Sequence, residues 1–403
     1  MTAISLAPSG AAGEAALWRL VRAGMLIRLC LAVVLHFAVN ESTFAPDQAV
    51  YHQGGAALAR YWEGSTPEVP WIFRQVGRTG YFYVVGALYL AFGDYALIPK
   101  LVNAIVGTLC IGLVFGVARR TTGSAAAALR TARFVTFFPS LVLWSVLNIR
   151  DVWVAMFILV IGLETMRLQE RVNVRSVVLA GSAVLALMQF RDYLFFAVVV
   201  PVLASFLIRS RGNLARNAVL GVVLAGLAVY VDTSVGSRRT VRSIDLETLS
   251  QLRAGTAVGD SAFDATADVS TPGRALAFLP KGLAYFLLAP FPWAIGNLRQ
   301  LFTLPEMLFF YSLVPAMMRG VAHLVRHRLR DSVMILSITG AITLGYALGQ
   351  GNQGTAYRHR AQVLPFYLAF GALGLEVRRV RGQRPAPAVG GRSGASEFHR
   401  RAP

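Results

Sequence analysis

The chain has 403 residues, of which 55% are hydrophobic and only 15% are charged, and its 39 basic and 20 acidic side chains give a net charge of +19. A soluble domain with so little charge could not cover its core, because exposed surfaces carry roughly a quarter to a third charged residues. Together with a mean hydropathy of +0.55, this composition excludes soluble enzymes and favours a polytopic membrane protein.

The positive charge lies in short clusters between apolar runs, and nearly all of it is arginine. A nucleic-acid-binding protein would instead gather its basic side chains on one face, around aromatic residues that stack on bases. Clusters between apolar runs are the pattern that orients a membrane protein. We therefore expect no nucleic-acid partner. We interpret most of the arginines as residues that mark the cytoplasmic turns and so set the membrane topology.

The first expected span covers residues 18–39, and the arginines at its start place the N-terminus in the cytoplasm. Residues 40–79 then form a first outer loop. Residues 80–92 are too few to cross the ~30 Å hydrocarbon core as a helix that rises ~1.5 Å per residue. They are expected to lie beside the membrane or to dip into it, and the second span is expected at 97–118.

The remaining spans follow from the same two criteria, apolar length and arginine placement. They are expected at 126–147, 152–168, 176–190, 193–208, 217–231, 303–322, 332–349 and 361–375. The result is an all-α transmembrane bundle of about ten spans in residues 1–375. A basic, disordered cytoplasmic tail that can touch anionic lipid is expected in residues 376–403.

A long outer excursion is expected at 232–302. It contains an amphipathic piece around 244–252 and an apolar tail at 275–293 that is interrupted by prolines. A full crossing by this tail would move the arginines at 326–330 to the outer side, so we expect an interfacial or re-entrant segment. The chain has no internal repeat of the kind that marks many secondary transporters.

Asp47 lies in the first outer loop, in the stretch 46–51 that also contains Tyr51, and a helix-like stretch at 53–62 follows. A carboxylate held at the membrane surface could take a proton from an acceptor hydroxyl or hold a divalent ion. An aspartate before a helix can equally cap the free N–H groups of the first turn. Both interpretations of Asp47 stay open at this point, and Tyr51 is a further pocket candidate.

Two Arg-Asp pairs lie where apolar runs meet, Arg150-Asp151 and Arg191-Asp192. Such a pair at a tight turn is most often an interfacial anchor whose charges are solvated or compensate each other. The functional alternative is that Arg150 or Arg191 faces a groove and binds phosphate, with the carboxylate steering it.

The densest outer cluster precedes the last span and contains Arg358, His359 and Arg360. Basic residues on the outer side are contrary to the positive-inside rule. Binding of an anionic lipid headgroup would explain why they are there. The alternative is that the arginines snorkel beside a turn. Within the first span, Arg28 and His36 share one helical face. Arg28 is expected to be structural, and His36 is a further pocket candidate.

The order of these features resembles the GT-C superfamily of polytopic membrane glycosyltransferases, which includes protein O-mannosyltransferase-like and lipid A aminosugar transferase-like enzymes. The resemblance rests on residues 47–51 with the helix after them, on the glycine-punctuated runs 83–93 and 101–107, and on the stretch 138–145. It covers the first half of the chain and the arginine-bearing last outer loop.

The resemblance implies transfer of a sugar from a polyprenyl-phosphate donor, whose tail stays in the bilayer, to a lipid, glycan or protein acceptor at the outer face of the plasma membrane. It implies that Asp47 is the first-loop acid, acting as a base or near a metal, and that Asp151 is a second acid. Arg358 and Arg360 take the place of the family's late phosphate-binding residues. Gln48 stands where many members have a second adjacent acid, which weakens the expectation of a metal.

An inverting lipid-linked glycosyltransferase is therefore the leading hypothesis, with Asp47 as the base and with Arg358 and Arg360 stabilising the departing polyprenyl phosphate. A polymerase or ligase of lipid-linked oligosaccharides would suit the long excursion at 232–302. A lipid or solute transporter is disfavoured by the missing repeat and by charges that crowd one face. A non-catalytic scaffold is the fourth interpretation, since no motif here is diagnostic.

Overall fold

The computed structural model describes residues 11–40, 43–74, 79–209, 226, 246–259, 261–296 and 298–382. In these residues the chain is mainly helical, and extended backbone pairs only at an isolated bridge between Ala262 and Asn352. The helices are α1 (Ala11–Ala38), α2 (Asp47–Trp62), α3 (Gly80–Phe92), α4 (Leu97–Thr122), α5 (Ala125–Phe137), α6 (Pro139–Trp144), α7 (Asp151–Glu170), α8 (Val174–Phe190), α9 (Leu194–Arg209), α11 (Leu246–Thr256), α12 (Pro272–Leu288), α13 (Leu298–His327), α14 (Leu329–Gly349), α15 (Gln353–Arg360) and α16 (Leu364–Gly382), with a short 3₁₀ helix η2 (Trp71–Arg74).

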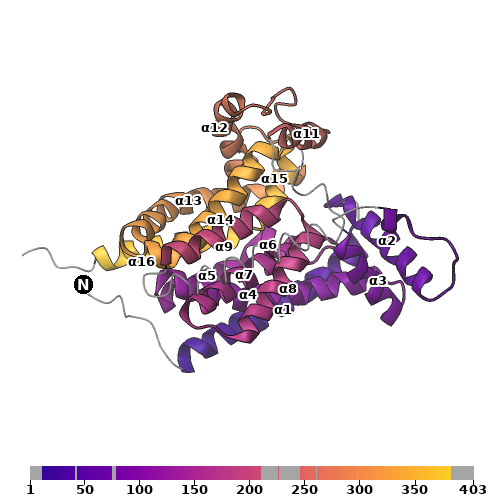
Figure 1. Cartoon of the computed structure of the whole chain (residues 1–403), viewed down its shortest axis with the longest axis horizontal. Coiled ribbons are helices and arrows are strands. Elements are labelled where there is room, and N and C mark those ends of the chain that lie inside the picture. The colour runs from indigo at the N-terminus through magenta and orange to yellow at the C-terminus, as the bar shows by residue number, and fades with distance from the viewer. Residues whose placement is uncertain are drawn as a thin grey trace, which may run out of the picture.

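The long helices lie side by side in one bundle (Figure 1). α4 packs against α1, α5 and α7, α16 packs against α13 and α5, and α9 packs against α14. α2 and α3 pack together at one end of the bundle, and α11 and α12 stand above α15. The predicted all-α membrane bundle is confirmed.

Among the described residues, four helices are long and apolar enough to cross a membrane, namely α1, α4, α13 from Gln300 onward, and α14. α3, α8 and α9 are apolar but shorter. The total of about ten spans stays a prediction. All of the expected span at 217–231 except residue 226 lies outside the described residues. Residues 232–245 of the excursion and most of the tail at 376–403 lie outside them as well.

One expected span is not continuous. Residues 126–147 form α5 and the short α6, which are separated at Phe138, where the backbone is extended with φ −68° and ψ 118°. The next residue is Pro139, which has no N–H and disfavours the α conformation in the residue before it. The prediction of a single span at 126–147 was therefore wrong. Residues 145–150 form turns and bends instead.

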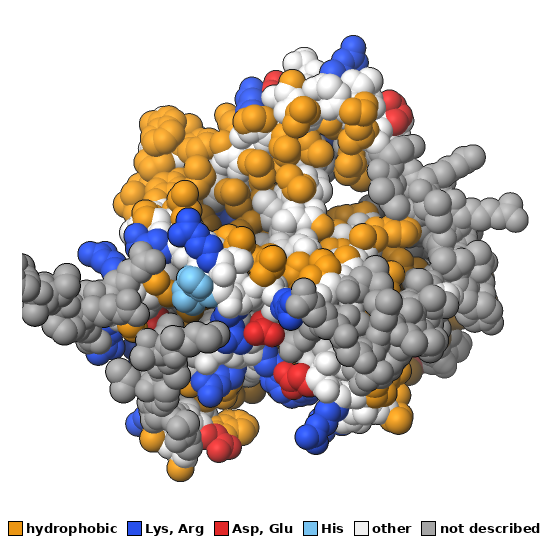
Figure 2. Space-filling view, turned by 60° about the vertical axis from the view of Figure 1, so that its left-hand side comes forward, with side chains coloured by type: hydrophobic (Ala, Val, Ile, Leu, Met, Phe, Trp, Pro, Cys, Tyr) orange, Lys and Arg blue, Asp and Glu red, His pale blue; other side chains and the backbone are white. Residues whose placement is uncertain are grey.

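The turns that were expected on the cytoplasmic side lie at one end of the bundle. Arg328, between α13 and α14, donates from Nε to the carbonyl oxygen of Thr121 at 3.2 Å. Ser124 donates to Glu376, near the end of α16, at 2.7 Å. Figure 2 shows most of the visible basic side chains gathered away from α11 and α12, with hydrophobic side chains between. The charges are thus separated along the bundle as the sequence predicts, while the direction of insertion stays a prediction.

Residues 246–293 form α11, α12 and their connections, which we call the α11–α12 unit. Arg253 fixes this unit in place, because its buried guanidinium donates to the carbonyl oxygens of Gln350 and Phe263 and lies 4.1 Å from the ring centroid of Phe278. Gln350 directly precedes α15. The contacts of Arg253, which we call the Arg253 clamp, therefore hold the unit over α15, which carries Arg358 and Arg360. The interfacial position of 275–293 stays a prediction.

Candidate active site

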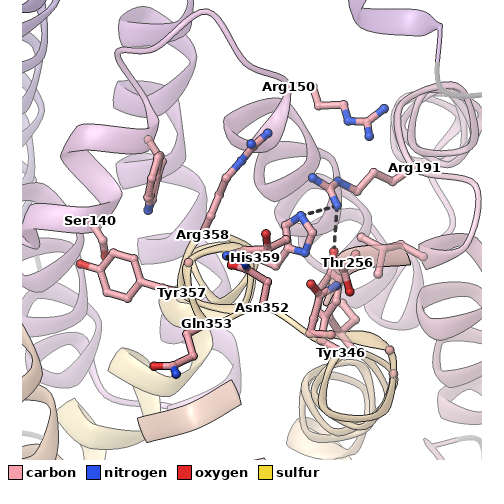
Figure 3. Close-up of a pocket in the computed structure, with 18 of the residues that line it drawn as sticks. Ser140, Arg150, Arg191, Thr256, Tyr346, Asn352, Gln353, Tyr357, Arg358 and His359 are labelled. Atoms are coloured by element: carbon pink, nitrogen blue, oxygen red, sulfur yellow. Dashed lines mark hydrogen bonds between the residues drawn. The ribbon is translucent and has the colours of Figure 1, made fainter. Parts of the chain in front are cut away.

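A cavity of about 1940 Å³ lies between the bundle and the α11–α12 unit. Figure 2 shows the molecule hollowed beneath this unit, and Figure 3 shows polar side chains that line the cavity. Most of its wall is apolar. Its charged side chains are Asp47, Glu306, Arg150, Arg191 and Arg358. Sites for one drug-sized ligand usually enclose about 300–1000 Å³, so this cavity has room for more than one bound group.

Asp151 is the centre of the charged cluster, although it lies behind the cavity wall. It is the first residue of α7, and its side chain is 1% exposed. Its Oδ1 accepts hydrogen bonds from Arg191 Nη2 at 2.6 Å and from Gln362 Nε2 at 2.7 Å. Its Oδ2 accepts from Arg358 Nε at 2.6 Å. One buried carboxylate therefore holds two guanidinium groups against the cavity.

Arg358 joins the two predicted acids, because its Nη1 also donates to Asp47 Oδ2 at 2.9 Å. Burial alone would lower the pKa of Arg358, but the negative charges of Asp151 and then Asp47 raise it above its ordinary value. Asp47 is 52% exposed and faces the cavity. The capping interpretation of Asp47 is not supported, since it is the first residue of α2 and the N-cap position is Pro46, which makes no side-chain cap.

Gln48 ties α2 to the segment that carries Asp151. It is buried, and its Oε1 accepts a hydrogen bond from the backbone N–H of Asn148 at 2.9 Å. This contact explains a glutamine beside Asp47, because an amide can accept from a buried N–H without placing another charge there. Gln48 is thus a residue that positions Asp47 relative to Asp151.

Asn103 of α4 anchors the same irregular segment. Its Nδ2 donates to the carbonyl oxygens of Leu147 and Ile149 at 2.6 Å and 2.9 Å, and its Oδ1 accepts from Trp153 Nε1 at 2.7 Å. Buried carbonyl groups outside a helix need such partners, since an unpaired one costs about 1–3 kcal/mol. The break at Pro139 and these side-chain bonds together set where α7 begins.

Arg191 and His359 meet on the cavity wall. Arg191 Nη1 lies 2.8 Å from His359 Nε2 and also contacts the Tyr193 hydroxyl. Because a guanidinium only donates, His359 Nε2 accepts and the imidazole proton resides on Nδ1. Burial and then the positive charge of Arg191 lower the pKa of His359 well below its ordinary value, so the ring is neutral at pH 7. It stacks on Tyr346 at a centroid distance of 4.8 Å.

The structure brings most of the predicted site residues together at this cavity. Those on its wall are Asp47, Arg150, Arg191, Arg358 and His359. Asp151 lies directly behind them and pairs with the arginine of the other Arg-Asp pair. Asp151 of one pair and Arg191 of the other therefore belong to one buried network and are not solvated anchors.

Three predicted site residues lie elsewhere. Arg360 is buried and donates to backbone carbonyls at the end of α12; since helical residues turn by about 100° each, it points away from Arg358. Tyr51 is buried edge-on against Tyr81 at 4.9 Å. His36 lies 3.3 Å from Lys100 Nζ, on the side of α1 that faces α4. None of the three is among the residues that line the cavity.

The residues of the cluster do not fit a divalent ion. Both oxygens of Asp151 accept from cationic or amide donors, and Asp47 accepts from Arg358. Hard cations need several free oxygen ligands. In the part of the chain that the structure describes, no three His, Cys, Asp or Glu side chains gather at a common point.

Sequence reasoning missed Glu306 and Tyr346, both of which line the cavity. Glu306 Oε2 accepts from the backbone N–H of Ser140 at 2.6 Å, and the Tyr346 hydroxyl donates to Gln362 at 2.7 Å. A signal for Glu306 was present, because an ionisable residue inside an expected span is a functional candidate by default. Tyr346 carried no such signal in an apolar run.

No protein-family model matches the chain, and no curated protein matches it in sequence. The solved structures that are similar to it include the following two. The crystal structure of the Archaeoglobus fulgidus oligosaccharyltransferase in the apo form gives a TM-score of 0.54 at 14% identity, over 92% of this chain and 51% of that chain. The crystal structure of ArnT from Cupriavidus metallidurans bound to undecaprenyl phosphate gives 0.51 at 17% identity, over 88% of this chain and 60% of that chain.

The likeness confirms the predicted polytopic helical fold. At this level of identity the likeness concerns the arrangement of helices, because one fold hosts many functions. The chain spans 51% and 60% of the length of the two matched chains. Activity, substrates and partners must therefore be argued from the site itself.

Proposed function

We propose that the protein transfers a sugar from a polyprenyl-phosphate donor to an acceptor hydroxyl at the outer face of the membrane. The observation that carries this proposal is the contact of Asp47 with Arg358 on the cavity wall, which places a proton acceptor beside a cation suited to phosphate. The fold supports the same chemistry, since it is shared with an oligosaccharyltransferase and with an ArnT structure bound to undecaprenyl phosphate.

The charge of the cluster favours an anion. On this side of the cavity three arginines lie near two aspartates, while the third acid, Glu306, lies beside Ser140, so positive charge is locally in excess. His359 adds a neutral donor, because its buried Nδ1 has no hydrogen-bond partner within the described residues. A buried donor left unpaired costs about 1–3 kcal/mol. A phosphate bound beside Arg191 would offset the excess charge.

An apolar arm of the cavity suits the polyprenyl tail. Beyond Arg191 the cavity runs between α9 and α14 and is lined by Ala197, Val200, Ala341 and Leu344. Val200 is 57% exposed and Leu344 is 44% exposed although both line the cavity. The arm therefore opens on the outside of the bundle, where a tail can stay in the bilayer while its phosphate reaches the arginines.

In the proposed reaction Asp47 takes the proton of the acceptor hydroxyl while the hydroxyl oxygen forms a bond to C1 of the sugar. The bond from C1 to the phosphate oxygen breaks, and its electron pair stays on the departing polyprenyl phosphate. Arg191 and Arg358 stabilise this charge. When Arg358 binds phosphate, its hold on Asp47 weakens, which frees the carboxylate as a base. Asp151 touches no substrate and positions both arginines.

The test measures release of polyprenyl phosphate by the purified full-length protein in lipid nanodiscs. Polyprenyl-phosphate donors labelled in the lipid and carrying monosaccharides or oligosaccharides are supplied with membrane lipid extract as the acceptor source. We expect release from at least one donor, and its loss in Asp47→Asn. The matched control is Glu63→Gln, because Glu63 is an exposed acid just after α2 that does not line the cavity. No release from any donor would overturn the proposal.

Product length separates this proposal from a polymerase or ligase of lipid-linked oligosaccharides. The large cavity beneath the α11–α12 unit has room for a glycan. This observation favours the polymerase or ligase as the second candidate function. A single added sugar or a single transferred glycan supports the transferase. A ladder of repeats from one donor would favour the polymerase.

A further inference from the structure

α15 presents side chains to the cavity in two directions, which define two sides of the cavity. Figure 3 shows Tyr357 leaving α15 toward Ser140 on one side, while His359 leaves it toward Arg191 on the other. The side with Arg191 continues into the arm between α9 and α14. We call the other side the Glu306 compartment, which is lined by Ser140, Glu306 and Tyr357. The two sides therefore differ in the helices that form them and in the charges that they present.

The Glu306 compartment presents an acid and hydroxyl groups where the other side presents guanidinium groups. Glu306 is 5% exposed and lies close to Tyr357. Arg360, the nearest cation, lies behind the Tyr357 ring at 5.0 Å and does not line the cavity. A phosphate placed here would meet a carboxylate and be repelled, whereas a sugar hydroxyl can donate to it.

This compartment also opens on the outside of the bundle. Its apolar wall comes from Leu31 and Leu35 of α1, Leu143 of α6 and Phe302 near the start of α13. Phe302 lines the cavity and is nevertheless 81% exposed. Both α1 and α13 are helices long and apolar enough to span a membrane. A molecule that reaches Glu306 by this route therefore comes from the lipid phase.

We propose that the acceptor is itself a membrane lipid, with an uncharged, hydroxyl-bearing head such as that of a glycolipid, and that it binds in the Glu306 compartment. This inference rests on the proposed transfer of sugar from a polyprenyl phosphate. A cavity of about 1940 Å³ exceeds the usual single-ligand site of about 300–1000 Å³ and can hold two lipid heads. Arg358 lies between the two sides in Figure 3. Asp47, which pairs with Arg358, is therefore placed where the two heads would meet.

The experiment maps two probes on the full-length protein in lipid nanodiscs. One is a dodecyl maltoside and the other a dodecyl phosphate, each with a photoactivatable diazirine in the alkyl chain, and the crosslinked peptides are identified by mass spectrometry. We expect the maltoside to label peptides of α1 and the start of α13. The phosphate should label α9 and α14. Free maltose at the same concentration should not protect against labelling by the maltoside, since it has no tail.

Two variants that fill opposite arms provide matched controls. Leu35→Trp fills the wall of the Glu306 compartment, and Ala341→Trp fills the arm between α9 and α14. We expect Leu35→Trp to lower labelling by the maltoside about tenfold and to leave labelling by the phosphate unchanged. Ala341→Trp should have the reverse effect. Mapping of the unaltered protein needs no substitution, so a variant that fails to fold does not prevent the test.

The outcomes separate this inference from the function on which it rests. If the phosphate labels α9 and α14 and donor turnover is observed, but the maltoside labels those same peptides, the lipid-acceptor inference alone is overturned. Protection by free maltose equal to that by unlabelled dodecyl maltoside would overturn it as well, because the tail would then contribute nothing. If the phosphate labels neither helix and no donor is turned over, the proposed function itself fails.

Discussion

At Asp151, loss of the charge should lower both stability and activity. Asp151→Asn keeps the shape of the side chain but leaves Arg191 and Arg358 buried without their shared carboxylate. Removing one partner of a buried ion pair costs about 3–5 kcal/mol. We expect a clearly lower thermal-unfolding midpoint of the purified protein. An unchanged midpoint would contradict the role of Asp151 in positioning both arginines.

Asp47 should behave in the opposite way. Its side chain is 52% exposed, and an ion pair of that kind contributes about 0–1 kcal/mol to folding. Asp47→Asn is therefore expected to unfold at nearly the same temperature as the unaltered protein while its turnover falls by about 10²–10⁴-fold. Measuring the midpoint and kcat on the same preparation tests this contrast with Asp151→Asn. A midpoint as low as that of Asp151→Asn would assign Asp47 to the fold rather than to the reaction.

His359 should make the protein less stable in acid. Its pKa is lowered well below the ordinary value by burial and by Arg191, while the unfolded chain has a histidine pKa of about 6.5. Above pH 6.5 both states are neutral and there is no penalty. As the pH falls below about 6.5 the unfolded state takes up a proton that the folded state does not, so the free energy of unfolding decreases. His359→Gln should reduce the difference in unfolding midpoint between pH 7.5 and pH 5, and an unchanged difference would contradict this account.

Candidate site residues could be selected from the sequence where neither packing nor membrane topology explained a charged side chain. Asp47 was selected as an acid in the expected first outer loop. Arg191 and Arg358 were selected because the orientation rule does not account for cations at the expected outer ends of apolar runs. Arg360 satisfied the same criterion but faces the protein interior. The separation of Arg358 from Arg360 depends on the rotation of α15, and that rotation is fixed by packing against α12 and α14, which the sequence does not reveal.

At the level of helices, apolar length located the elements well. The short element expected at 80–92 is α3, and the span expected at 97–118 is the first part of α4. The span expected at 126–147 failed at Pro139, because hydrophobic content continues across a point where the backbone cannot remain helical. That break is also what carries the chain into the segment that Gln48 and Asn103 hold. An error in the prediction of one helix therefore concealed part of the site.

The hold of the α11–α12 unit on α15 can be tested through Arg253. Arg253→Met removes hydrogen bonds to the carbonyl oxygens of Gln350 and Phe263, each of which is worth about 1 kcal/mol or more. We expect faster hydrogen exchange in α11 and in residues 349–353, with little change in α4. The control is Arg274→Met, because Arg274 forms an exposed ion pair on the same unit and such pairs contribute little. Equal exchange in the two variants would contradict the clamp.

Over the whole molecule, the polar groups divide between two ends of the bundle. One end carries the turns after α4 and α13, joined by the contact of Arg328 with Thr121. The other carries the carboxylates and arginines of the cavity. The arginines at the first end agree with the orientation rule and pair with local partners, as Arg328 does with Asp331. At the cavity, Arg191 and Arg358 are bound to Asp151 and Asp47. This division predicts that the cavity faces outward and the basic turns face the cytoplasm.

Cysteine labelling tests that orientation directly. Val258 is 64% exposed in the α11–α12 unit, and Val172 is 52% exposed in the basic turn between α7 and α8. In a chain with Cys30→Ala and Cys110→Ala, Val258→Cys should react with a membrane-impermeant maleimide on intact cells. Val172→Cys should react only after the membrane is permeabilised. The reverse pattern would invert the molecule and place the proposed transfer on the cytoplasmic face, and reaction of both before permeabilisation would mean that the two ends are not separated by a bilayer.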